Sequence, residues 1–373
     1  MIVLGLGGMG SATLYHLARR GLRVLGLERF DLVHEYGSSH GLTRIIRLAY
    51  WEHPTYVALL RRSYELWREL EQLAGERLLH ITGSVDAGPE NGAVFQGALR
   101  SSRLHDLPHE VLDGDELHAR FPGYRLPKAL RCLYQPEGGF LLPERCDVAH
   151  VEQALALRAE VHCREPVLEW GAGGGRVWVR TARAQYEAGR LAICAGPWAA
   201  KLIPELAGLA VAERQVLAWL QPSQPDHFRL DTFPVFNLEV EEGRYYGFPS
   251  FLIPGFKFGK YHHRGEQVDP DAARREPDAE DERLLRDFAR RYFPEGAGPT
   301  LMLKSCLFTN SPDRHFILDR HPHHPEVAIA AGFSGHGYKF CSVVGEIMAD
   351  LAQDRRGHDI DFFSLGRFAP PRG

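Results

Sequence analysis

Residues 1–28 of this chain are MIVLGLGGMGSATLYHLARRGLRVLGLE, and this stretch decides the fold. The apolar residues 2–4 predict a short strand, residues 11–20 carry apolar side chains at helical spacing, and residues 22–28 predict a second strand. A glycine-rich turn lies between the first strand and the helix. We therefore predict that the chain begins with a β-α-β unit, which belongs to a parallel α/β sheet.

The glycine turn contains Gly5, Gly7 and Gly10 in the spacing G-x-G-x-x-G, and Glu28 ends the second predicted strand. Glycines let the backbone approach a pyrophosphate, and free N–H groups at the helix start favour its charge. A carboxylate about 20 residues further on accepts hydrogen bonds from a ribose and disfavours a 2′-phosphate. An ordinary glycine turn would need neither the acid nor this placement. The motif therefore predicts binding of FAD or NAD.

The length and composition of the chain limit the classes of protein that it can be. At 373 residues it exceeds the size of one simple core, so we expect two domains. The 44 basic and 48 acidic residues give a net charge of −4, which offers little attraction for nucleic acid. We find neither an apolar run of membrane-spanning length nor an export signal. The six cysteines form no Cys-x-x-Cys pair, so we expect a cytoplasmic protein without nucleic-acid or membrane partners.

The predicted elements suggest how the two domains divide the chain. Helices and strands typical of an α/β domain recur after residue 143 and again near the end, whereas the stretches between them carry short β-rich runs. We predict a mixed α/β fold with a Rossmann-like dinucleotide domain and an antiparallel-sheet substrate domain. The first is built from residues 1–77, 143–212 and 309–373, and the second from residues 78–142 and 213–308. The acidic and arginine-rich residues 271–283 are expected on the solvated surface.

Four motifs resemble a known family. They are GSSHGLTRIIRLAY at 37–50, YYGFPS at 245–250, KSC at 304–306 and GFSGHGYKF at 332–340. With them the chain is similar, from its first residue to Phe368, to the flavin amine oxidases with the D-amino-acid oxidase fold. Within these enzymes it resembles monomeric sarcosine oxidase and its relatives, which include N-methyltryptophan oxidase and pipecolate oxidase. The resemblance implies FAD as the cofactor and a monomer.

The resemblance gives Cys306 a specific role. A lone cysteine is ordinarily a small buried hydrophobe, but a cysteine in this context is joined to the flavin by a thioether in the family. The sequence Cys306-Leu-Phe308-Thr matches that context, with phenylalanine where sarcosine oxidase has tyrosine. The missing hydroxyl leaves the substrate preference open and does not affect the expected covalent attachment.

The resemblance also implies how substrate and cofactor are held. Arg44 is expected against the flavin, while Arg47 and Lys339 bind the substrate carboxylate from opposite ends of the chain. Without the motif, both cations would be expected in weak surface ion pairs. His40 is expected to position the flavin, with base catalysis as a weaker alternative, and Tyr246 is a further catalytic residue. The remaining residues assigned to cofactor binding are Thr43, Val167, Gly196, Trp198, Gly335, His336 and Gly337, together with Lys339 itself.

A lysine and a histidine in the β-rich segment complete the implied site. Lys257 matches the family lysine that promotes reaction with oxygen, and His262 matches a histidine of the substrate pocket. Between Pro249 and His262 the chain is one residue longer than the family pattern, so Lys260 is an alternative for the lysine role. We favour Lys257 because Gly255-x-Lys257 fits that pattern. His263 is expected at the surface. The dense histidines at 321–324 are expected to point outward, without a metal.

The function that follows is an FAD enzyme that oxidises the C–N bond of a small secondary amino acid to an imine. Water would then release the aldehyde and the amine, and O2 would be reduced to hydrogen peroxide. The alternatives within enzymes are a glycine or D-amino-acid oxidase and an amine dehydrogenase that passes electrons to a carrier. From another class, the chain could be a flavin-binding subunit without turnover. The expected partners are a small amino acid and O2.

Overall fold

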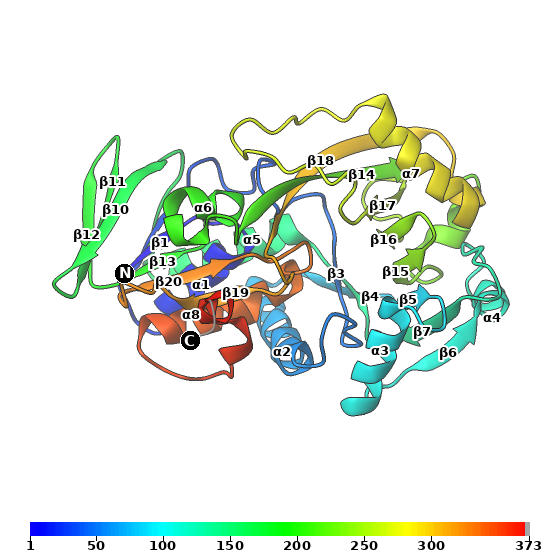
Figure 1. The fold of residues 1–373 in the computed structure, drawn as a ribbon, viewed down its shortest axis with the longest axis horizontal. Helices are drawn as coiled ribbons and strands as arrows, with labels where there is room; N and C mark the ends of the chain where they lie inside the picture. The colour runs from blue at the N-terminus through cyan, green and yellow to red at the C-terminus, as the bar shows by residue number, and fades with distance from the viewer. Residues whose placement is uncertain (370–373) are drawn as a thin grey trace.

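The computed structural model describes residues 1–369. A six-stranded sheet, on the left of Figure 1, is built from three separate stretches of the chain. The strand order is β19-β20-β13-β1-β2-β9, and all neighbours are parallel except β19 and β20. Its strands, in chain order, are β1 (Ile2–Leu4), β2 (Leu25–Leu27), β9 (Glu160–His162), β13 (Leu191–Ile193), β19 (Ile317–Arg320) and β20 (Val327–Ala331). The predicted β-α-β start is therefore present.

Helices cover this sheet and pack closely against one another. They are α1 (Gly8–Arg19), α2 (Tyr56–Ala74), α5 (Pro143–Ala156) and α8 (Cys341–Ala352). A Cβ at Gly345 would lie 2.5 Å from the carbonyl carbon of Ala12, so the absent side chain lets α8 approach α1. Apolar residues from these helices and the strands form one continuous core around Trp67 and Phe340.

A small antiparallel sheet lies at the outer edge of this half of the molecule. Its strands are β10 (Val167–Gly173), β11 (Arg176–Thr181) and β12 (Gln185–Ala188), and the short helix α6 (Ala199–Leu202) lies nearby. Val177 and Val179 share a core with Leu191 and Ile329 of the parallel sheet. Val167, at the start of β10, is partly buried against the same core.

The other half of the molecule is built on an eight-stranded sheet, on the right of Figure 1, with the order β18-β14-β17-β16-β15-β5-β7-β6. Its neighbours are antiparallel except β15 and β5. Its strands are β5 (Ser84–Gly88), β6 (Glu110–Asp113), β7 (Arg131–Gln135), β14 (Val211–Leu220), β15 (Val235–Val240), β16 (Gly243–Phe248), β17 (Phe256–Lys260) and β18 (Thr300–Asn310). The helices of this half are α3 (Ala93–Leu104), α4 (Gly114–Arg120) and α7 (Ala279–Tyr292). The predicted mixed α/β class is confirmed.

The two faces of this sheet have different partners. Tyr245 stacks on Phe288 of α7, with ring centroids 3.7 Å apart. Successive residues of a strand point to opposite faces, so Tyr246 lies on the other face, in the same apolar cluster as Cys306 and Phe308. This second face, which α7 does not cover, carries two of the residues expected in catalysis, Tyr246 and Lys257.

A third small sheet joins the halves, with the strands β3 (Arg44–Ile46), β4 (Leu79–Ile81) and β8 (Gly139–Leu141). Strands β14 and β18 run across the predicted domain boundaries at 212/213 and 308/309. The division into domains stays a proposal, and residues 370–373 of its last segment lie outside the described residues. Within residues 1–369, no helix is both long enough and apolar enough to span a membrane.

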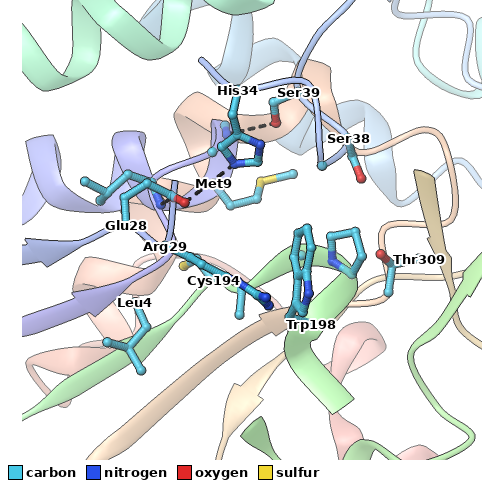
Figure 2. Close-up of a pocket in the computed structure, with 18 of the residues that line it drawn as sticks. Leu4, Met9, Glu28, Arg29, His34, Ser38, Ser39, Cys194, Trp198 and Thr309 are labelled. Atoms are coloured by element: carbon cyan, nitrogen blue, oxygen red, sulfur yellow. Dashed lines mark hydrogen bonds and ion pairs between the residues drawn. The ribbon is translucent and has the colours of Figure 1, made fainter. Parts of the chain in front are cut away.

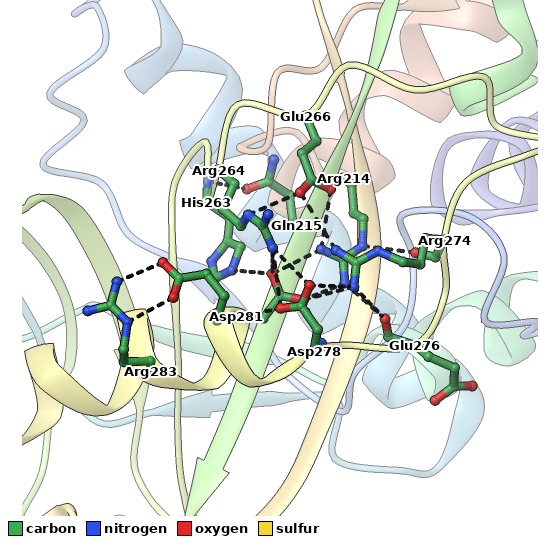
Figure 3. Close-up of polar contacts among 11 residues, drawn as sticks. Arg214, Gln215, His263, Arg264, Glu266, Arg274, Glu276, Asp278, Asp281 and Arg283 are labelled. Atoms are coloured by element: carbon green, nitrogen blue, oxygen red, sulfur yellow. Dashed lines mark hydrogen bonds and ion pairs between the residues drawn. The ribbon is translucent and has the colours of Figure 1, made fainter.

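Two expectations about the surface need correction: residues 271–283 are exposed or half-buried except for Asp281, and His263 is not at the surface. Within residues 271–283, Asp281 is fully buried and pairs with Arg214 of β14 at 2.7 Å. His263 is also buried, and its Nε2 lies 3.0 Å from Asp281 Oδ1. Figure 3 shows these side chains converging at the start of α7, where Asp281 closes a capping box with Asp278. Burial is tolerated here because each charge has a partner, and the pairing ties α7 to β14.

The histidine cluster after β19 also differs from the expectation. His321 is buried, and its ring packs against that of Trp170 at a centroid distance of 5.5 Å. Only His323 has a largely exposed side chain among the histidines that face Glu205. Thus the turn folds His321 inward against β10, because its imidazole finds both an aromatic and an acidic neighbour there.

Candidate active site

A cavity of about 610 Å³ lies at the carboxyl ends of β1, β2 and β13, where ligands bind in parallel α/β sheets. Gly5 has a φ of +80°, and a Cβ at Gly10 would lie 1.7 Å from the Gly5 carbonyl oxygen. The glycines therefore bring the start of α1 against the turn. Figure 2 shows Glu28, Arg29 and Trp198 around this cavity.

Most residues predicted to bind the cofactor line this cavity. They are Gly5, Gly7, Glu28, Arg44, Val167, Gly196, Trp198, Gly335 and Gly337. The others do not belong to its described lining, namely Gly10, Thr43, Cys306, His336 and Lys339. The lining extends from Glu28 at the end of β2 to Phe308 of β18. Such an extended cavity, with glycines and a helix start in its wall, fits a dinucleotide.

Cys306 lies on β18, directly before the cavity-lining residues Leu307 and Phe308. Its side chain is buried, and burial raises the pKa of the thiol, while the charge of Arg44 acts in the opposite direction. The guanidinium of Arg44 lines the cavity and donates to the Ser38 carbonyl at 2.8 Å. The predicted attachment residue and the predicted flavin-packing arginine therefore share one region of the site.

Lys257 and Lys260 lie on opposite faces of β17. Nζ of Lys257 donates to the carbonyl of Gly41 at 2.6 Å and to the carbonyl and hydroxyl of Thr43, both at 2.8 Å. Burial, and then the charge of Arg44, lowers the pKa of Lys257 well below its ordinary value. Lys260 Nζ instead lies over the ring of Tyr245, 5.9 Å from its centroid, on the face toward α7. Of the two lysines, Lys257 is the one that contacts residues 41–43, directly before Arg44 at the start of β3.

Arg47 and Lys339 come together on the ring of Tyr50, although they are far apart in the sequence. The Arg47 guanidinium carbon lies 4.8 Å from the ring centroid and Lys339 Nζ lies 5.3 Å from it. Burial, followed by the charge of Arg47, lowers the pKa of Lys339 to about 7. Both cations suit a carboxylate ligand, which is the role expected of them.

Two acids that the sequence did not single out already pair with Arg47. Its Nη2 lies 2.9 Å from Glu52 Oε2, and its Nε lies 3.1 Å from Asp86 Oδ1. Burial raises the pKa of Asp86 to about 7 against the charge of Arg47. Asp86 lies between Val85 and Ala87 in a fully buried strand. A carboxylate in such a strand is the signal that would have identified it.

His262 follows β17 with a φ of +56°, and its Nδ1 lies 2.8 Å from Glu213 Oε2. Its Nε2 is buried without a hydrogen-bond partner among residues 1–369. Burial raises the pKa of Glu213, but the hydrogen bond from His262 brings it below its ordinary value. Glu213 was not predicted, because its pairing with His262 depends on the fold of the turn after β17.

The other predicted residues lie around the same centre. His40 is buried, and neither ring nitrogen has a hydrogen-bond partner in the described part of the chain. Burial, followed by Arg44, lowers its pKa well below the ordinary value. Tyr246 packs against Tyr261 at 4.8 Å between ring centroids. His336 Nδ1 lies 2.6 Å from the Tyr50 hydroxyl, so His336 supports the ring on which the two cations meet.

Comparisons with known proteins find relatives that match nearly the whole chain. Residues 1–351 match the family model described as "DAO: FAD dependent oxidoreductase". The chain is 42% identical over 375 residues to monomeric sarcosine oxidase of Streptomyces avermitilis, covering 99% of this chain and 97% of that protein. It is 34% identical over 373 residues to N-methyl-L-tryptophan oxidase of Yersinia pestis, covering 99% of each. The open form of NikD, an unusual amino acid oxidase essential for nikkomycin biosynthesis, has a TM-score of 0.85 and 26% identity, covering 97% of this chain and 96% of that one. The predicted resemblance and the cofactor FAD are confirmed.

Proposed function

Because the chain belongs to the DAO family of FAD dependent oxidoreductases, we propose that it oxidises the C–N bond of a small secondary amino acid, N-methylated or cyclic, such as sarcosine. The observation that carries this proposal is the meeting of Arg47 and Lys339 on Tyr50. A pair of cations recognises the carboxylate of an amino acid. The turn that leads to Lys339 also contributes Gly335 and Gly337 to the dinucleotide cavity.

The residues of the cavity would hold FAD by its pyrophosphate and ribose, with Cys306 as the proposed covalent link. When bound there, FAD would supply a two-electron acceptor for the substrate and a donor to O2, with hydrogen peroxide as the product. The substrate loses two electrons and two protons to become an imine, and water then releases the aldehyde and the amine. The oxidation requires the substrate nitrogen to be unprotonated. The protein must also orient the C–H bond of the substrate carbon next to this nitrogen.

The position of each proposed site residue indicates its role in the reaction. Arg47 and Lys339 fix the carboxylate, which orients the carbon next to the nitrogen. His262 keeps a free Nε2, because its Nδ1 is held by Glu213. Lys257 is held in place by the hydrogen bonds that it donates to Gly41 and Thr43, so its positive charge would stabilise the negative charge that develops during reaction with oxygen. Phe308 provides an apolar wall of the cavity.

A panel of amino acids tests the proposal. Purified protein should release peroxide with N-methyl or cyclic secondary amino acids and respond more weakly to glycine and D-alanine. A preference for the primary amines would favour the glycine or D-amino-acid oxidase alternative. Flavin reduction without peroxide release would favour a carrier-linked dehydrogenase. Bound flavin that no amine reduces would favour a subunit without turnover.

The proposal extends to state and location. We propose a monomer, as the name of the sarcosine oxidase relatives suggests, acting in the cytoplasm. All six cysteines of the described chain are free thiols, which suits a reducing compartment. Light scattering of the purified protein and fractionation of the source cells test the two statements.

A further inference from the structure

Several buried polar atoms beside Arg47 lack a hydrogen-bond partner. Asp86 on β5 and Asn237 on β15 are opposite each other in register, and both are fully buried. Within residues 1–369, no hydrogen bond of good geometry reaches either carboxylate oxygen of Asp86 or starts from Nδ2 of Asn237, although the Asn237 amide is close enough to act against the rise in the pKa of Asp86. The only charge that Asp86 contacts closely is Arg47, 3.1 Å away, among the described residues.

Arg244 extends this polar group along the sheet. It lies on β16, two residues before Tyr246, so that both side chains point to the face that α7 does not cover. Its guanidinium lies between the rings of Trp51 and Tyr261, 4.4 Å and 3.6 Å from their centroids. Nε of Arg244 also has no hydrogen-bond partner in the part of the chain that the structure describes.

Unpaired polar atoms in a protein interior are unfavourable, because each loses its hydrogen bonds to water. Apolar side chains at these positions would fill the same space without that loss. The unpaired atoms lie next to Arg47, on the face that carries Tyr246 and Lys257, so a ligand that satisfies them would be bound where the proposed substrate is bound. A methyl or aromatic substrate side chain would leave them unpaired.

We propose that Asp86, Asn237 and Arg244 form a subsite for an uncharged polar side chain of the substrate, such as a carboxamide, which both donates and accepts hydrogen bonds. This inference rests on the proposed function, since it names the substrate class of the same site. Asp86 accepts from the side chain, while Asn237 Nδ2 and Arg244 Nε donate to it. A cationic side chain would meet Arg47 and Arg244, and an anionic one would meet Asp86 and Glu52, so the charges of the site disfavour both.

Two substrates of nearly equal shape test the subsite. N-methyl-L-asparagine and N-methyl-L-leucine differ in whether the branched end of the side chain forms hydrogen bonds. We expect kcat/KM for anaerobic flavin reduction to be at least about tenfold higher for N-methyl-L-asparagine. Equal values, or a preference for N-methyl-L-leucine, would overturn the inference.

A binding measurement separates this inference from the proposed function. Succinamate and 4-methylpentanoate are carboxylates with the same two side-chain ends and no amine to oxidise, and their binding to the holoenzyme can be followed by the flavin absorbance. Tighter binding of succinamate, by at least about tenfold, supports the subsite even if no N-methyl amino acid reduces the flavin. In that case only the proposed reaction fails. Flavin reduction by N-methyl amino acids without either preference would remove the subsite alone.

Variants assign the preference to the named residues. In Asp86→Leu and Asn237→Leu, the polar partner of the substrate side chain is replaced by an apolar one. The preference for N-methyl-L-asparagine over N-methyl-L-leucine, and that for succinamate over 4-methylpentanoate, should then fall to less than about threefold. Asp350→Asn is the matched control, since Asp350 is also a buried aspartate and pairs with Arg20 at 2.8 Å in the other half of the molecule. Ratios that persist in both leucine variants would contradict the assignment. The wild-type ratios decide the inference if a variant does not fold.

Discussion

Oε2 of Glu213 lies 2.8 Å from Nδ1 of His262, and this contact joins β14 to the turn after β17. Glu213 lies on the same face of β14 as Gln215, whose register partner is Cys306. The carboxylate therefore orients His262 from the strand next to the proposed attachment site of the flavin. A carboxylate bound to one ring nitrogen of a histidine fixes the tautomer of the imidazole and the direction of the other nitrogen.

Replacing Glu213 by Gln should slow anaerobic flavin reduction about tenfold or more, because Nε2 of His262 is no longer held in place. Glu213→Asp should restore part of the rate. Carboxylate inhibitors should bind as in the wild type, since Arg47 and Lys339 are unchanged. If Glu213→Gln has the same rate of flavin reduction as the wild type at every pH, the contact between Glu213 and His262 is only structural.

Replacing Cys306 by Ala should remove the covalent link to the flavin and leave FAD bound through the cavity. Protein precipitated in acid tests this, since a thioether survives unfolding and the cavity does not. The wild-type pellet should stay yellow, while that of Cys306→Ala should be colourless. Cys194→Ala is a control, because Cys194 also lines the cavity without the family context. Free flavin in the wild-type supernatant would contradict covalent attachment.

Replacing Lys257 by Met should leave anaerobic reduction within about tenfold and slow reoxidation by orders of magnitude, since a fixed charge stabilises developing superoxide. Lys260→Met is the matched control on the same strand, with its side chain on the opposite face. If Lys260→Met were the variant with slow reoxidation, the extra residue of this segment would lie elsewhere and Lys260 would match the family lysine. Stopped-flow reoxidation of the reduced protein measures both.

Replacing Arg47 or Lys339 by Ala should weaken carboxylate inhibitors about 30-fold to several thousandfold, corresponding to about 2–5 kcal/mol for one partner of a buried charge pair. Inhibitor titrations measure the loss. Binding in the wild type should also weaken as pH rises through about 7, because Lys339 loses its proton there and Asp86 gains negative charge. Lys339→Met combined with Asp86→Asn should remove this dependence. Unchanged inhibitor binding in both alanine variants would place the carboxylate elsewhere.

Replacing Asp281 by Asn should lower the free energy of unfolding by about 3–5 kcal/mol at neutral pH, since buried Arg214 would lose its closest carboxylate and keep only the longer contact to Glu266 at 3.5 Å. Burial raises the pKa of Asp281, but Arg214 more than offsets this, so its pKa lies below the ordinary value. Its stabilising effect is therefore present above the unfolded pKa of about 3.9 and is lost as pH falls below it. Denaturant titrations at two pH values measure both effects. Asp287→Asn, half exposed on the same helix, should change little.

The sequence predicted the dinucleotide motif well, because its chemistry depends on neighbouring residues. The spacing of Gly5, Gly7, Gly10 and Glu28 is local, and the glycines themselves form the first turn, so α1 begins at Gly8 and not at residue 11. Glycine has no apolar side chain, and the helical pattern therefore becomes visible one turn too late.

The partners of the catalytic residues could not be predicted in the same way. Glu213 reaches His262, and Asp86 reaches Arg47, only through strand register and tertiary packing. His263 is buried because Asp281 caps a helix 18 residues further on. The motifs thus gave the cations and histidines that are proposed for the site, while the acids beside them depend on contacts between distant strands.

One anaerobic experiment tests the central claim most directly. Purified yellow protein is mixed with sarcosine in the absence of oxygen, and air is then admitted while peroxide is measured. The account predicts that the visible flavin absorbance bleaches, then returns in air with one peroxide released for each flavin reoxidised. Flavin that stays oxidised with sarcosine, pipecolate and every other secondary amino acid tried would contradict it.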